Sequence, residues 1–60
     1  MRLMKLITEK NKNIYINPAQ FVSVFTPDSG RTIVETAATM VIVKNTPEDV
    51  AKEFLAAMVE

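Results

Sequence analysis

The chain has 60 residues, enough for one domain (residues 1–60) with a small hydrophobic core. It contains no cysteine and no histidine, which excludes disulfides, thiolate metal sites and the side chain most often used as a general base. Seven basic residues balance seven acidic ones, so no overall field draws the chain toward nucleic acid or a membrane surface.

The opening segment "MRLMKLITEK" bears on where the protein works. It carries positive charge, but its apolar run is short and lacks a small-residue cleavage site, so it does not resemble a secretion signal. No apolar run in the chain approaches the roughly 20 residues needed to cross a bilayer. We therefore expect a cytoplasmic protein of bacterial or phage-type origin with no membrane insertion.

The first three quarters of the chain alternate apolar and polar side chains, which is typical of β-strands. The first strand places Met4 and Leu6 on one face and Leu3 and Ile7 on the other. The predicted strands cover residues 2–8, 14–16, 21–25, 31–36 and 40–44.

The strand at 21–25, "FVSVF", shows the cleanest alternation. Regular pleating puts Phe21 and Phe25 on one face with Ser23, and Val22 and Val24 on the other.

Prolines and the single glycine mark the turns between these strands. Asn17 followed by Pro18 suits a type I turn, because the asparagine side chain bonds the backbone ahead and proline presets φ. Pro27 and Gly30 suit a hairpin connection in which the glycine adopts the left-handed conformation. The alanines at 37–38 form either an atypical hairpin tip or a bend imposed by a partner, and the sequence does not decide between these.

The segment after Asn45 predicts a helix. Thr46 is suited to the N-cap and Pro47 to the first helical position, where a missing N–H costs nothing. Glu48 and Asp49 place negative charge at the positive end of the helix dipole.

Apolar residues recur along this helix at helical spacing. Val50, Phe54 and Met58 lie four residues apart, with Ala51 and Leu55 beside them. We expect this stripe to pack on the sheet.

Together these elements predict an α+β fold: an antiparallel meander of four to five short strands, with one C-terminal helix on one face. With 48% hydrophobic residues, one helix cannot cover every apolar side chain. We expect Leu3, Ile7, Phe21 and Phe25 to form a second apolar surface, an interface for a homodimer or a larger protein partner.

The residues needed for catalysis are scarce. Ser23 and Ser29 have no histidine to activate them, and one glycine, Gly30, cannot build a phosphate-binding loop. We therefore expect a non-enzymatic protein with no cofactor and no metal.

The alternative function is binding of single-stranded nucleic acid. Residues 1–26 carry four basic side chains against one acidic, whereas residues 47–60 carry four acidic against one basic. Lys5, Lys10 and Lys12, with Tyr15 and Phe21 nearby, would form a basic and aromatic sheet face of the kind on which bases stack. The net charge of zero argues against this alternative.

The segments "YINPAQFVSV" and "VIVKNTPEDVAKEF" resemble the small FlbD-like (SwrD) flagellar proteins of bacteria over about residues 13–55. The resemblance implies a role in swarming motility or the flagellar motor, without enzyme activity or a cofactor. Ala37 and Ala38 stand where that family has an Asn-Gly turn, and a phage or prophage protein is the alternative origin. The matching residues are Asn17, Pro18, Pro27, Asp28, Val41, Val43, Lys44, Thr46, Glu48 and Val50.

Overall fold

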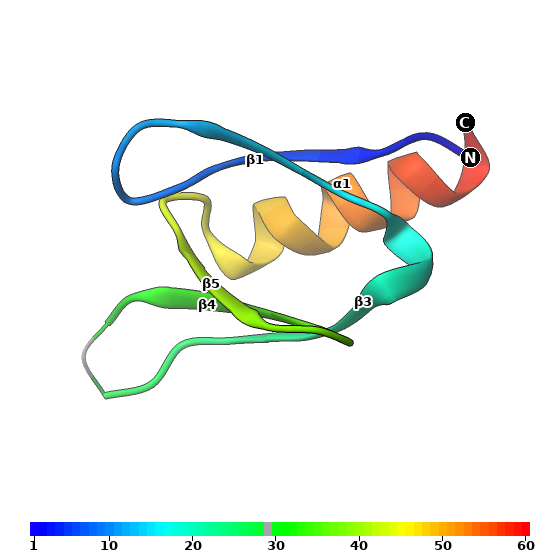
Figure 1. The fold of residues 1–60 in the computed structure, drawn as a ribbon. Coiled ribbons are helices and arrows are strands. Elements are labelled where there is room, and N and C mark those ends of the chain that lie inside the picture. The colour runs from blue at the N-terminus through cyan, green and yellow to red at the C-terminus, as the bar shows by residue number, and fades with distance from the viewer. Residues whose placement is uncertain (29) are drawn as a thin grey trace.

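The computed structural model describes residues 1–28 and 30–60. Within these residues five short strands precede one C-terminal α-helix, so the predicted α+β class is confirmed (Figure 1). The elements are β1 (Met4–Ile7), β2 (Asn13–Ile16), the 3₁₀ turn η1 (Pro18–Gln20), β3 (Phe21–Phe25), β4 (Thr32–Thr36), β5 (Met40–Val43) and α1 (Pro47–Val59).

The strands form two antiparallel sheets rather than the single sheet that we predicted. β1 pairs with β2, and β3, β4 and β5 form a three-stranded sheet in that order. The sheets meet at one corner, through a bridge between Thr8 and Val43 and a 2.8 Å bond from the Lys44 N–H to the Ile7 carbonyl. Pairing stops there because the chain turns at Thr8, whose N–H bonds the Lys12 carbonyl at 2.8 Å.

The helix lies between the β1–β2 hairpin and the three-stranded sheet, and the two chain ends are close together (Figure 1). Its side chains meet those of both sheets in one core, which buries apolar surface from three sides. The core residues are Met4, Leu6, Ile16, Val34, Val43, Val50 and Ala57.

The predicted faces of the first strand are confirmed. Met4 and Leu6 are fully buried, whereas Leu3 and Ile7 are exposed. The alternation holds here because β1 pairs with β2 in unbroken register, so every second side chain meets the core.

The predicted faces of β3 are wrong, because the strand contains a β-bulge. Phe21 pairs with Thr36 and Ser23 with Glu35, so Val22 is an extra residue on this strand. Phe21 and Val24 consequently pack on the core, while Phe25 is exposed. Phe21 and Phe25 therefore lie on opposite faces.

The predicted inner stripe of the helix is partly wrong. Val50 is buried and Phe54 packs on the core, but the third member of the inner face is Ala57 rather than Met58. The inner face of α1 therefore runs through Val50, Phe54 and Ala57, and Met58 is 46% exposed. The Arg2 N–H donates to the Ala57 carbonyl at 2.9 Å.

The turns at Asn17 and Gly30 follow their predicted chemistry. The Asn17 side chain accepts a bond from the Ala19 N–H at 2.9 Å and caps η1. Gly30 has a φ of +82°, in the left-handed region that glycine tolerates best, and its N–H bonds the Pro27 carbonyl. Ser29 lies outside the described residues.

The connection between β4 and β5 is a hairpin tip, and Thr36 organises it. The Thr36 hydroxyl donates to the Thr39 carbonyl and accepts from the N–H groups of Ala38 and Thr39, at 3.1–3.3 Å. The Ala37 N–H donates to the Gln20 carbonyl. Hydrogen bonds of a threonine side chain thus close this hairpin, and neither Ala37 nor Ala38 has the positive φ that an Asn-Gly turn uses.

Helix α1 begins at the predicted residue. The Thr46 hydroxyl accepts a hydrogen bond from the Asp49 N–H at 3.1 Å, and Pro47 is the first helical residue.

One ion pair, which sequence analysis did not predict, joins α1 to the segment just before β1. The Arg2 guanidinium contacts both oxygens of Glu53, at 2.7 and 3.2 Å, and the Lys5 N–H donates to Glu53 at 2.8 Å. The bonds from Arg2 lower the pKa of Glu53 most, and the bond from the Lys5 N–H lowers it further.

Candidate interaction surface

The outer sheet face, which we define as the side of the three-stranded sheet turned away from α1, carries an apolar row. Phe25 pairs with Ile33, and Ile33 pairs with Ile42, so the three side chains cross the sheet as direct neighbours. Their strand neighbours Val34 and Val43 point the other way, into the core. The row therefore extends over all three strands on a side that the helix does not cover, with Phe25 exposed and Ile33 and Ile42 half-buried.

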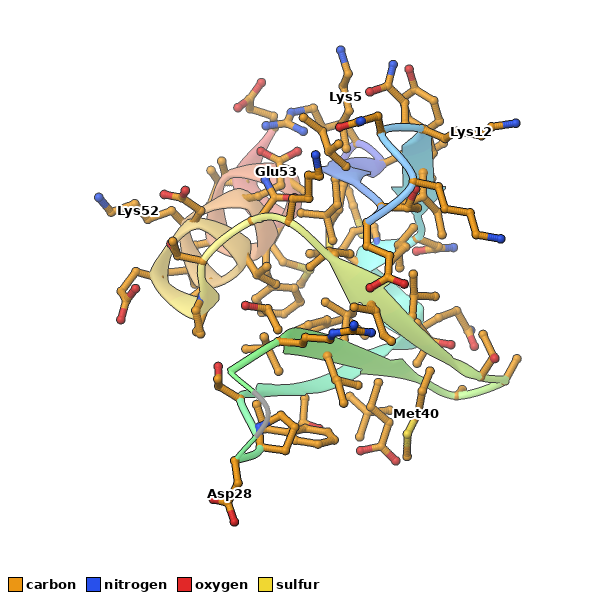
Figure 2. All side chains as sticks on the ribbon, turned by 90° about the vertical axis from the view of Figure 1, so that its left-hand side faces the viewer. Lys5, Lys12, Asp28, Met40, Lys52 and Glu53 are labelled. Carbon is orange, nitrogen blue, oxygen red and sulfur yellow. The ribbon has the colours of Figure 1, made fainter. Side chains whose placement is uncertain are left out.

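Met40 extends this row at the start of β5. Its side chain is 60% exposed and points away from the helix (Figure 2). It pairs with Glu35, whose carboxylate accepts a 2.8 Å bond from the Ser23 hydroxyl. This polar pair borders the apolar row, so the outer sheet face has an apolar centre and a polar margin.

A shallow groove of about 410 Å³ connects this face with the tip of the β1–β2 hairpin. Two lysines, Lys10 and Lys12, line it from the hairpin side, and Arg31 pairs with Glu9 at 3.1 Å beside it. The groove thus has a positive rim. Its lining residues are Thr8, Glu9, Lys10, Lys12, Met40, Val41 and Ile42.

The structure scatters the four residues predicted as an apolar interface. Phe25 belongs to the outer sheet face, and its side chain is 40% exposed. Leu3 and Ile7 are exposed on the hairpin instead. Phe21 packs on the core, where its ring lies 4.8 Å from that of Phe54 between centroids. Only Phe25 of the four therefore lies on the largest apolar row of the sheet.

Sequence analysis missed Ile33, Ile42 and Met40 as members of this surface. The signal was present, because strands 31–36 and 40–44 have apolar residues at successive positions, which is typical of a strand that presents apolar side chains on both faces. The helix can cover only one of those faces.

Four of the residues predicted for nucleic-acid binding lie on the β1–β2 hairpin, whereas the fifth, Phe21, packs on the core and is not part of that face. Tyr15 pairs directly with Lys5, and both are exposed. Lys10 and Lys12 are exposed at the hairpin tip, and Lys5 and Lys12 both project into solvent (Figure 2). The structure therefore brings Lys5 and Tyr15 together.

Two features are absent among residues 1–28 and 30–60: a metal-binding cluster and a membrane-spanning helix. They contain no group of three or more acidic side chains that could hold a metal ion. No helix among them is long and apolar enough to span a bilayer. Comparisons with protein-family models, with curated proteins and with solved structures found no match.

Proposed function

We propose that this protein is a non-catalytic interaction module that associates with further copies of itself through the outer sheet face. The supporting observation is the row of Phe25, Ile33 and Ile42, which crosses all three strands and continues to the 60% exposed Met40. Contiguous apolar surface on a small domain is typical of interaction sites.

The size of the domain supports the same proposal. A chain of this length buries roughly 60% of its unfolded surface, and its stability margin is correspondingly thin. The sequence holds no cysteine or histidine for the disulfide or metal that stabilises many small domains. Covering the outer sheet face with protein would bury further apolar surface.

Sedimentation velocity over a wide concentration range tests this proposal. We expect the mean mass to rise with concentration, and Met40→Ser to shift that rise to higher concentration by removing exposed apolar surface from the outer sheet face. Tyr15→Ser is the matched control, because Tyr15 is similarly exposed (57%) but lies on the hairpin. A wild-type chain that stays monomeric at millimolar concentration would refute the proposal.

A second function, binding of single-stranded nucleic acid, is favoured by one observation. The register of the hairpin places the Tyr15 ring opposite the Lys5 side chain on an exposed face. A base could stack on the ring while the ammonium group contacts its phosphate. A labelled oligonucleotide titrated at low salt tests this function, and absence of binding there would reject it.

A role of this protein in bacterial motility rests on the resemblance to the FlbD-like proteins and stays a prediction. Motility genes beside the gene for this chain would support it, whereas phage genes would favour the alternative origin.

A further inference from the structure

The helix carries a second uncovered apolar surface, which we call the helix stripe. It consists of Ala51, Leu55, Met58 and Val59, spaced by three or four residues so that they share one side of α1. Leu55 is 63% exposed, Met58 46% and Val59 85%, whereas Val50 and Ala57 are buried. The stripe adjoins the core-facing residues but makes no part of the core.

The charges beside the two surfaces are opposite in sign. Lys10 and Lys12 line the groove at the outer sheet face, where the carboxylate of Glu9 is paired with Arg31. The other acidic residue of this face, Glu35, accepts a hydrogen bond from Ser23. Glu48 and Asp49 stand at the exposed start of the helix, with Lys52 as the nearby opposing charge. Because these acidic groups precede the helix stripe, an approaching helix would bring negative charge toward the lysines.

Contact between two outer sheet faces lacks this complementarity. A face-to-face contact that brings the two lysine-lined grooves together would set like charges against each other, which opposes association. The charges therefore favour a contact between unlike surfaces.

We infer that the outer sheet face of one copy binds the helix stripe of the next copy, head to tail. This inference rests on the proposed self-association and names the surface that the partner copy supplies. The dimensions fit: a 13-residue helix is about 20 Å long, and three strands are about 14 Å wide. The sheet would then have a helix on each face, its own on the inside and a neighbour's on the outside.

Head-to-tail contact has a consequence for assembly size. After one such contact, one copy retains a free helix stripe and the other a free outer sheet face, so the assembly grows into chains or rings rather than stopping at a two-fold dimer. The participating patches are small, and interfaces below about 1,200 Å² in total are typical of weak association. We expect growth over the micromolar to millimolar range.

A mixing experiment on the full chain tests this inference. Met40→Glu disables the outer sheet face and Leu55→Glu disables the helix stripe, and both positions are exposed enough to leave the core intact. We expect each variant alone to associate at least tenfold more weakly than wild type in sedimentation velocity. Mixed in equal amounts, they should form a 1:1 dimer through their two intact surfaces and stop there.

Tyr15→Glu serves as the control, because it adds the same charge at an exposed apolar position outside both surfaces. It should assemble like wild type. Far-UV circular dichroism and the urea midpoint establish that each variant is folded, and Val59→Glu replaces Leu55→Glu if the latter is not.

The outcomes separate this inference from the proposed function. Wild-type assembly that is lost in Met40→Glu but unchanged in Leu55→Glu would leave self-association standing and overturn the head-to-tail contact. Monomeric single variants that fail to pair on mixing would overturn it as well. A monomeric wild type would overturn both proposals.

Discussion

Replacing Phe21 and Phe54 with leucine, singly and together, measures how α1 is held on β3. The two rings lie 4.8 Å apart between centroids, with an angle of 32° between their planes. Aromatic pairs at this distance contribute about 0.5–1.5 kcal/mol beyond the burial of their area. In a double-mutant cycle, we expect the losses in the free energy of unfolding to depart from additivity by that amount.

The single variants should remain folded. Removing a fully buried phenylalanine down to alanine costs about 3–5 kcal/mol, but Phe54 is only partly buried and leucine retains most of its volume. We expect each Phe→Leu change to cost about 1–2 kcal/mol. Typical stabilities per residue give a chain of this length about 3–9 kcal/mol in total, which exceeds the cost of either single change.

Urea denaturation followed by far-UV circular dichroism measures these free energies. Phe25→Leu is the matched control, because Phe25 is 40% exposed and lies on the other side of the bulge in β3. The Phe25 and Phe54 changes should add to within about 0.5 kcal/mol. Additive losses for Phe21 and Phe54, with coupled losses for Phe25 and Phe54, would refute the assignment of Phe21 to the core.

Three further substitutions test local features by the same urea assay. Gly30→Ala should cost about 1–2 kcal/mol through backbone strain alone, because φ is +82° and the space around Gly30 admits a Cβ; Gly30→Asn should cost less. Thr36→Val should cost about 1–2 kcal/mol by removing the hydroxyl that closes the β4–β5 hairpin, and Thr36→Ser should restore most of it. Glu53→Gln should lower the free energy of unfolding at neutral pH and make it depend less on pH in the acid range. The pKa of Glu53 is lowered in the folded state, so its contribution is complete above the usual 4.5 and is lost as the pH falls through the lower folded value. If the free energy of unfolding falls with acid pH in the variant as it does in wild type, this role of Glu53 is contradicted.

Local chemistry made most elements of the fold predictable. Thr46 and Pro47 define the start of α1 through a side-chain oxygen and a missing N–H, and neither effect depends on the rest of the molecule. The requirement for glycine at position 30 is equally local, because only the backbone of its own turn needs a positive φ. The alternation of Met4 and Leu6 in β1 was sufficient to identify that strand's buried face.

The candidate surface was less predictable, because two of its causes are tertiary. The bulge at Val22 moves Phe21 to the core and leaves Phe25 on the outer sheet face, and the regular alternation of "FVSVF" does not reveal it. The orientation of α1 about its axis is the second cause: it buries Ala57, whose carbonyl accepts from the Arg2 N–H, and exposes Leu55 and Met58. Each effect moves apolar side chains from a predicted face to another.

The sequence by itself determined the α+β class, the order of the elements, the capped helix and the surplus of apolar side chains, because propensity, capping and turn chemistry act over a few neighbouring residues. The tertiary structure alone decided which side chains form that surplus at the surface. Burial depends on register and helix rotation, and these are set by contacts between residues far apart in the chain, such as Arg2 with Glu53 and Phe21 with Phe54.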